Sequence, residues 1–220
     1  MGKKMDFKKL INKHIESCQS KINKRNRERL CNEKPTIICS NCLGGILYHW
    51  LGLEFRSPFI NLFFKNEDFI LLLENLEEFL ATEIVEDKES KRNFPVGIGY
   101  KGIKVYFMHY KTFEEAIIKW NARKERMSRD NLVVLFSNFE GDEKILERFQ
   151  KLPFRNKLVF VEEKYKNYDC TLCLSGYEKY KERHRKNKGS IPNIWHTKSY
   201  VTGERFIDEF DYVEYLNSIL

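Results

Sequence analysis

The sequence predicts an α/β layered domain with a mainly parallel sheet, an antiparallel hairpin and an N-terminal amphipathic helix. Short apolar runs rich in β-branched residues alternate with longer segments of helical periodicity, the pattern of strands linked by helices. Of the 220 residues, 42% are hydrophobic and 14% aromatic, as in a globular domain. The excess positive charge lies at the start of the chain. We therefore divide the chain into a basic leader over residues 1–34 and a single domain over residues 35–220.

The leader carries the whole charge excess of the chain. It has eleven basic and four acidic residues, and this difference of seven equals the net charge of +7. Its apolar side chains, with one histidine among them, recur every three or four residues: Phe7, Leu10, Ile11, His14, Ile15, Cys18 and Ile22. We expect an amphipathic helix that docks on the domain or on a second subunit. Contact of residues 3–29 with an anionic membrane surface stays open. Nucleic-acid binding is not expected, because the basic residues lack interleaved aromatic side chains.

The segment after the leader predicts a ligand site. The β-branched run Thr36–Ile38 is typical of a buried strand, and an apolar helix is expected over Cys42–Leu51. Polar Ser40 and Asn41 follow the strand, and Gly44–Gly45 lets the backbone bend or a ligand approach closely. A strand-to-helix turn at the carboxyl edge of a sheet presents backbone N–H groups, which suit anionic ligands. We expect these residues to bind a phosphate or a donor oxygen.

The other elements follow from periodicity and turn residues. Further strands are expected over Leu132–Phe136, Lys157–Val161 and Thr171–Leu174, and a hairpin over Phe94–Tyr100 and Ile103–His109. Helices are expected over Asn66–Leu80, Phe113–Met127, Asp142–Lys151 and Ile207–Leu220. Asn66 is expected to cap the first of these helices, and Thr112 with Glu115 to form a capping box on the second. The charged segment Thr82–Asn93 is expected to lie on the surface.

Composition also bears on the compartment. No segment approaches the run of about 20 apolar residues that spans a bilayer, and the first residues lack the apolar core of a secretory signal. Six cysteines without such a signal indicate reduced thiols. We expect a cytoplasmic protein, with the leader as the one route to the inner face of the membrane.

Two Cys-x-x-Cys pairs could in principle bind zinc or carry out disulfide redox chemistry. They are Cys39 with Cys42 and Cys170 with Cys173. A zinc ribbon keeps its two pairs about 15–20 residues apart, whereas these lie far apart in the sequence. Cys39 and Cys173 also fall inside apolar runs. We expect buried free thiols and no metal site.

Two residues are candidates for catalysis. Cys42 begins a predicted helix, where the helix dipole lowers a thiol pKa and favours nucleophilic attack. His49 lies two turns further along that helix, about 10 Å away, too far for a direct hydrogen bond. A base for Cys42 would therefore be His109 or His196; the alternative is that Cys42 is a packing residue. His109, followed by Tyr110, ends a predicted strand and suits an acid, a base or a phosphate ligand, or a purely structural role.

The basic end of the predicted helix over Phe113–Met127 offers a second group of ligand-binding candidates. Arg123 and Arg126 are three residues apart and share a helix face, so together they could clamp a diphosphate; the alternative is a solvated helix end. Neither a P-loop nor a G-x-G-x-x-G fingerprint occurs in the chain. The sequence therefore identifies no cofactor.

Several phrases of the sequence, taken together, resemble a bacterial family called domain of unknown function 1919. They run in order through the chain: Ser40–His49, Leu51–Leu53, Ser57–Pro58, Asn61–Phe64, Phe94–Gly97, His109–Tyr110, Glu115–Ala116, Lys119–Trp120, Arg123, Arg126 and Leu152–Lys157. Members are often labelled exopolysaccharide-biosynthesis proteins. The resemblance implies a cytoplasmic α/β protein associated with surface polysaccharide, and it supplies no reaction. Among the matched residues we take His49, Asn61, Tyr110 and Trp120 as further ligand-binding candidates.

Three functional hypotheses follow. The first is a transferase in exopolysaccharide or capsule assembly that acts on a nucleotide sugar or a phosphorylated glycan carrier, with His109 as acid or base. The second is a non-catalytic protein that binds a glycan or another assembly protein. The third is hydrolase or acyl-transfer chemistry at Cys42.

Overall fold

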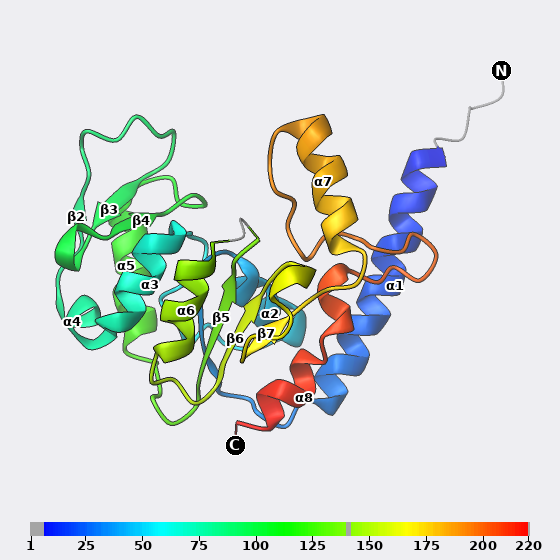
Figure 1. Cartoon of the computed structure of the whole chain (residues 1–220), viewed down its shortest axis with the longest axis horizontal. Coiled ribbons are helices and arrows are strands. Elements are labelled where there is room, and N and C mark those ends of the chain that lie inside the picture. The colour runs from blue at the N-terminus through cyan, green and yellow to red at the C-terminus, as the bar shows by residue number, and fades with distance from the viewer. Residues whose placement is uncertain (1–6, 140–141, 220) are drawn as a thin grey trace.

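The computed structural model describes residues 7–139 and 142–219, which form a mixed α/β fold with two sheets (Figure 1). The parallel sheet has the strand order β1-β5-β6-β7, and the antiparallel sheet has the order β2-β3-β4. The strands are β1 (Thr36–Cys39), β2 (Val85–Glu86), β3 (Val96–Ile98), β4 (Lys104–Tyr106), β5 (Leu132–Ser137), β6 (Lys157–Phe160) and β7 (Thr171–Leu172). The predicted fold class is confirmed.

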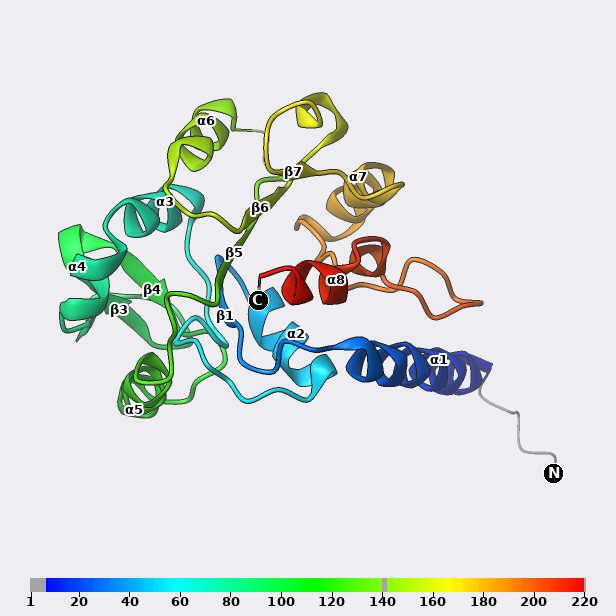
Figure 2. The same ribbon diagram turned by 90° about the horizontal axis from the view of Figure 1, so that it is seen from below.

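Eight α-helices and three short 3-10 helices connect these strands within the described residues. The α-helices are α1 (Phe7–Arg29), α2 (Leu43–Leu51), α3 (Asn66–Glu74), α4 (Leu76–Ala81), α5 (Phe113–Lys124), α6 (Glu143–Lys151), α7 (Tyr177–Lys188) and α8 (Tyr212–Asn217). The 3-10 helices are η1 (Tyr100–Gly102), η2 (Glu163–Tyr165) and η3 (Phe206–Glu209). Seen from below, α3, α5 and α6 lie on one side of the parallel sheet, and α1, α2, α7 and α8 lie on the other (Figure 2).

Alternating side chains of the parallel strands enter two separate cores. Ile38 and Val134 pair across β1 and β5 and pack with α3, α5 and α6. Their neighbours Ile37 and Val133 point to the opposite face and pack with α2 and α8. Because both faces are covered, these strands are apolar throughout rather than alternating between apolar and polar residues.

The paired glycines pack α2 closely against β1. They lie inside the first turn of the helix, where a Cβ atom on Gly44 would be 3.3 Å from the Cβ of Cys39 and the Cγ2 of Ile37. A Cβ atom on Gly45 would be 3.1 Å from the Cγ2 of Ile60. Both glycines are buried, and their close approach is to neighbouring side chains; a role for them in ligand binding stays a prediction.

Two predicted helices are each divided in the structure. The expected helix over Asn66–Leu80 breaks at Asn75, whose φ of −133° is not helical and whose side-chain amide donates to the Leu71 carbonyl at 2.8 Å. Asn66 is the first helical residue rather than the cap, which is Lys65. The terminal helix likewise breaks at Phe210, between η3 and α8.

Other local predictions are confirmed. β3 and β4 form the expected antiparallel hairpin, and its turn contains Lys101 with a positive φ of 54°. The Thr112 hydroxyl accepts a hydrogen bond from the Glu115 N–H at 3.1 Å, so the predicted cap of α5 is present. The expected surface excursion also contains β2, which pairs with β3.

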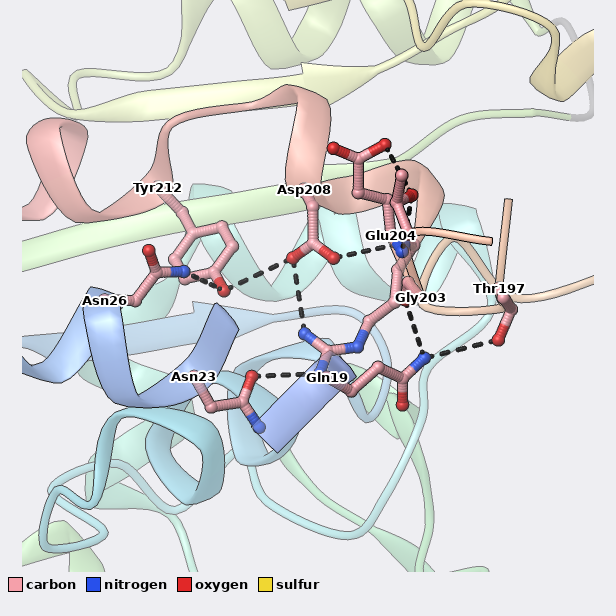
Figure 3. Close-up of polar contacts among 10 residues, drawn as sticks. Gln19, Asn23, Asn26, Thr197, Gly203, Glu204, Asp208 and Tyr212 are labelled. Carbon is pink, nitrogen blue, oxygen red and sulfur yellow. Dashed lines mark hydrogen bonds and ion pairs between the residues drawn. The ribbon is translucent and has the colours of Figure 1, made fainter. Parts of the chain in front are cut away.

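The second half of helix α1 docks on the domain, where Gln19, Asn23 and Asn26 contact the C-terminal segment (Figure 3). The Asn26 amide donates to the Tyr212 hydroxyl at 2.8 Å, and the Gln19 amide donates to the Thr197 hydroxyl at 3.3 Å and the Gly203 carbonyl at 3.1 Å. The Arg205 guanidinium donates to the Asn23 side chain at 2.9 Å. Polar contacts with the C-terminal segment therefore hold the leader in place. No helix within the described ranges combines the length and apolar character needed to cross a bilayer.

Candidate functional site

A cavity of about 1020 Å³ lies at the carboxyl end of the parallel sheet. Ser40 and Asn41 reach it directly after β1, and Ser137 ends β5 beside them. The remaining walls come from the segments that follow α2 and β4 and from residues 190–195. Its lining is Ser40, Asn41, Cys42, Ile46, Asn61, Phe63, Phe64, Asn66, Met108, His109, Ser137, Phe139, Tyr177, Ser190, Ile191, Pro192, Asn193, Ile194 and Trp195. Carboxyl edges of parallel strands are where α/β folds usually bind ligands.

Amide side chains at the cavity are held in place by hydrogen bonds. The Asn41 Oδ1 accepts from the Leu43 N–H at 3.0 Å, and its Nδ2 donates to the Ser137 hydroxyl at 3.4 Å. On the next wall, the Asn66 amide donates to the Asn138 side chain at 3.3 Å, and Asn138 is fully buried. These contacts connect the ends of β1 and β5 to the starts of α2 and α3.

Asn61 reaches the same region in a strained backbone conformation. Its φ of 62° lies in the left-handed region, which residues other than glycine rarely adopt, although Asn is among the more frequent of them. A Cβ atom on Gly45 would lie 3.8 Å from the Asn61 Oδ1, which places this amide beside the start of α2. Strained residues of this kind are concentrated at ligand sites, so the observation adds to the candidacy of Asn61.

The side chains that line the cavity are mostly uncharged. Among the described residues that line it, none is Asp, Glu, Lys or Arg. Hydroxyl and amide groups alternate with the aromatic side chains of Phe63, Phe64, Phe139, Tyr177 and Trp195. Such a surface offers hydrogen bonds in both directions and flat apolar faces, which suits an uncharged polar ligand better than a diphosphate.

The environment of Cys42 reverses the expected shift of its pKa. Its Sγ lies 3.9 Å from the Leu62 carbonyl and 4.0 Å from the Met108 sulfur. Burial raises the pKa of the Cys42 thiol to about 11, and it also raises the pKa of Cys39 to about 11. Loss of solvation therefore outweighs the helix dipole. At neutral pH only about one Cys42 side chain in 10⁴ is a thiolate, so the thiol is a poor nucleophile.

Five predicted site residues are brought together at the cavity: Ser40, Asn41, Cys42, Asn61 and His109. His109 is exposed on its wall. The roles of these residues stay predictions.

The predicted arginine clamp is not at the cavity. Arg123 is 8% exposed, donates to the Tyr110 hydroxyl at 2.6 Å and lies 5.0 Å from the centre of the Phe55 ring. Arg126 donates to the Phe55 carbonyl at 3.1 Å and pairs with Glu54 at 3.4 Å. Both arginines are therefore engaged with the segment that follows α2.

The other candidates are structural or remote from the cavity. The Tyr110 hydroxyl donates to the Ile60 carbonyl at 3.1 Å, and Trp120 is 3% exposed among aromatic rings. His49 is exposed at the far end of α2. These residues do not line the cavity.

Sequence reasoning missed part of the lining. Ser137 directly follows the clearest buried strand, so the rule that selected Ser40 and Asn41 could also have found it. Residues 190–195 gave no such signal. They reach the cavity through a long-range contact, in which the Tyr177 hydroxyl donates to the Pro192 carbonyl.

A smaller cavity of about 360 Å³ adjoins the first and shares Phe139 and Tyr177 with it. It contains an ion pair between buried Lys181 and half-buried Glu162, and Lys181 also donates to the Phe139 carbonyl at 3.0 Å. Burial lowers the pKa of Lys181. Charged groups thus stand next to the neutral cavity without entering it.

Within the described ranges, no group of three or more His, Cys, Asp or Glu side chains is placed to hold a metal ion. The two Cys-x-x-Cys pairs therefore form no joint site there, and all six cysteines are free thiols.

Comparison with known proteins confirms the resemblance noted in the sequence. Residues 12–217 match the model of a family described as Domain of unknown function (DUF1919). An uncharacterized protein of Haemophilus influenzae (strain ATCC 51907 / DSM 11121 / KW20 / Rd) is 31% identical over 212 residues, which cover 92% of this chain and 98% of that relative. The chain therefore belongs to the DUF1919 family.

Proposed function

We propose that this chain is a cytoplasmic transferase of exopolysaccharide or capsule biosynthesis that acts on a nucleotide sugar or a phosphorylated glycan carrier. The observation that carries the proposal is the neutral cavity at the carboxyl end of the parallel sheet, with amide, hydroxyl and aromatic walls. Its volume of about 1020 Å³ is at the upper end of the range of small-molecule sites. The polysaccharide context comes from the family resemblance.

The lining suggests how a sugar would be held. The side chains of Asn41, Asn61 and Ser137 can donate to or accept from sugar hydroxyls, and aromatic rings such as Trp195 can cover the apolar face of the ring. The start of α2 adds a partial positive charge for a phosphate oxygen. Because the described lining holds no arginine or lysine, a diphosphate is expected to extend out of the cavity.

His109 is the proposed acid or base. It follows β4 and is exposed on the cavity wall, where an imidazole is a suitable general acid or base. In a transfer from a nucleotide sugar, the imidazole would accept the proton of the acceptor hydroxyl as its oxygen bonds to the anomeric carbon. The bond from that carbon to the phosphate oxygen breaks, and the nucleoside diphosphate leaves with the electron pair. Arg123 and Arg126 have no part in this proposal.

A second candidate function is supported by a specific observation. The described lining has a single imidazole, no carboxylate, and a thiol at Cys42 whose pKa is about 11. The described lining therefore offers few groups for acid–base or nucleophilic catalysis, whereas its amide, hydroxyl and aromatic side chains suit binding. A non-catalytic glycan-binding protein is therefore the alternative.

A thermal-shift screen tests the proposal. Nucleotide sugars, nucleoside diphosphates and acetyl-CoA are added to the wild-type protein, to Asn41→Ala and to Asn121→Ala, an exposed control on α5. A ligand at about 100 times its dissociation constant adds about 2.7 kcal/mol. For a chain of this size the midpoint should rise by about 5–10 °C.

The outcomes separate the hypotheses. A shift with one donor class that is lost in Asn41→Ala and kept in Asn121→Ala supports a sugar site in the cavity. The same shift without any product after long incubation with acceptor glycans favours the binding protein. No shift with any of these compounds contradicts a transferase that uses a nucleotide sugar and favours the non-catalytic binding protein.

A further inference from the structure

We propose that this chain docks on an anionic membrane surface through a docking tip. The tip consists of Phe7 and Leu10 on α1 and of Tyr200 and Val201 in the neighbouring loop. Their exposed fractions are 74%, 44%, 65% and 80%. Seven large apolar side chains are exposed among the described residues, and four of them lie in the tip. Solvent exposure of apolar groups at one end of a protein marks an interaction surface.

Direct contacts bring the two parts of the tip together. The His14 imidazole donates from Nε2 to the Val201 carbonyl at 2.8 Å, and Leu10 lies one helical turn before His14. At Gly203, a Cβ atom would be only 2.5 Å from the Cβ of Cys18, so the loop lies tightly against α1. Both views show the loop alongside α1, away from the sheets (Figures 1 and 2).

The docking tip continues the apolar stripe of the amphipathic helix. Further along the stripe, Ile15 is buried, and Cys18 and Ile22 are half-buried against the domain. Phe7 and Leu10 belong to the same stripe but lie beyond the covering segment. The domain therefore covers only the later part of the apolar stripe. The exposed side chains at the start of the stripe can enter the interfacial layer of a membrane.

The positive charge around the docking tip favours an anionic lipid surface as its partner. Residues 1–34 carry the entire net charge of +7, and Lys8 and Lys13 are exposed beside the tip. A second copy of the chain would bring an equally basic helix, which would oppose pairing of two tips. An anionic lipid surface instead attracts each lysine and accepts the apolar side chains.

Helix α7 extends the basic surface. Its last turns expose Arg185, Lys186 and Lys188, and this end projects toward the same side of the molecule as the start of α1 (Figure 1). Residues 190–195, which follow α7 directly, form a wall of the cavity. Docking by both helix ends therefore turns the cavity toward the membrane. There it would meet a lipid-linked glycan; this last step alone rests on the proposed function.

Vesicle co-sedimentation tests the docking. The full chain is mixed with vesicles of phosphatidylcholine alone and with vesicles of phosphatidylcholine and phosphatidylglycerol. We expect binding to the anionic vesicles only, weakened at high salt because surface charges are screened. The variant Phe7→Ser/Val201→Ser should bind about tenfold more weakly, since two apolar groups no longer enter the interface.

Control variants elsewhere on the surface test whether the loss of binding is specific to the docking tip and the lysines beside it. Ile118→Ser changes a comparably exposed apolar side chain on α5 (59%), and it should leave vesicle binding unchanged. If the serine variant of the tip fails to fold, Lys8→Glu/Lys13→Glu changes only exposed side chains and should also weaken binding, whereas Lys119→Glu on α5 should not. Unchanged thermal midpoints establish that the variants are folded.

Three kinds of result would overturn the proposal. One is equal binding to neutral and anionic vesicles, or no binding to either. Another is binding that the tip variants leave intact. The third is a concentration-dependent dimer in sedimentation velocity that Phe7→Ser/Val201→Ser dissolves, which would assign the tip to self-association. Because the vesicles contain no sugar, each result is independent of the thermal-shift screen.

Discussion

The Arg205 guanidinium lies over the ring of Trp50, with its Cζ 3.6 Å from the ring centre. Trp50 is near the end of α2, whereas Arg205 precedes η3, so this contact joins the first helix of the domain to its C-terminal segment. The same guanidinium binds Asn23 of α1 and pairs with Asp208 at 3.3 Å. One buried cation thus connects the leader, α2 and the end of the chain.

Removing this cation should destabilise the whole fold. Arg205 is 1% exposed, so Arg205→Ala leaves the buried Asp208 carboxylate without its partner. We expect a loss of about 3–5 kcal/mol in the free energy of unfolding, measured by urea denaturation. Arg129→Ala is the control. It breaks an exposed ion pair with Glu77 and should cost about 1 kcal/mol or less. Equal losses in the two variants would contradict the role of Arg205.

Gly203 is the position where the loop of the docking tip requires glycine. Its φ is +74°, and a Cβ atom would be 2.5 Å from the Cβ of Cys18 and 3.2 Å from the Ile15 carbonyl. Gly203→Ala should therefore combine backbone strain of about 1–2 kcal/mol with a steric clash of about 1–3 kcal/mol.

Gly189 provides a matched control for this prediction. Its φ is also positive, at +67°, but a Cβ atom added there would meet no other atom within 4 Å, so Gly189→Ala should show the backbone strain alone. Urea denaturation of the two variants measures the difference. The prediction fails if Gly203→Ala is no less stable than Gly189→Ala.

The sequence predicts the sheets better than the helix ends. The runs that became β1 and β5 are apolar and bounded by polar residues, so local pattern is sufficient for them. The break at Asn75 escapes the same reasoning because the apolar spacing continues through it. It arises where the Asn75 amide bonds to the Leu71 carbonyl, a competition between side chain and backbone that periodicity does not record.

In the candidate site, too, some residues could be predicted from local sequence and others could not. Ser40 and Asn41 could be identified because they follow a strand directly, whereas Trp195 reaches the cavity through folding of a distant segment. Arg123 shows the opposite error. Its place at a helix end predicts solvent exposure or phosphate binding, yet the Tyr110 hydroxyl and the Phe55 ring bury it. Burial of a long cationic side chain depends on partners that its own helix does not reveal.

The Cys42 thiol should react slowly at neutral pH. Its raised pKa of about 11 follows from burial, and alkylation requires the thiolate. We expect the iodoacetamide rate at Cys42, followed by mass spectrometry, to rise about tenfold per pH unit between about pH 7 and pH 9. Cys31 is exposed and should be modified first. Rapid modification of Cys42 at neutral pH would contradict the geometry and revive the nucleophile hypothesis.

The environment of His196 predicts that stability falls in mild acid. Its Nδ1 is hydrogen-bonded to the Tyr180 hydroxyl at 2.9 Å, and the ring is half-buried. Burial lowers the pKa of His196, and electrostatic interaction with His184 and Lys188 lowers it further. The unfolded chain therefore binds a proton more readily than the folded one. Stability should be full above the ordinary histidine pKa of 6.5 and fall as the pH approaches the lower folded value.

Urea denaturation between about pH 5 and pH 8 measures this dependence in the wild-type protein and in His196→Gln. The glutamine cannot take up a proton, so its stability should vary less with pH across the interval, at the cost of lower stability at the alkaline end where the Tyr180 contact is lost. His49→Gln changes an exposed histidine and should retain the wild-type profile. If His196→Gln shows the same pH dependence as the wild type, the acid sensitivity belongs to another group and the assignment to His196 is wrong.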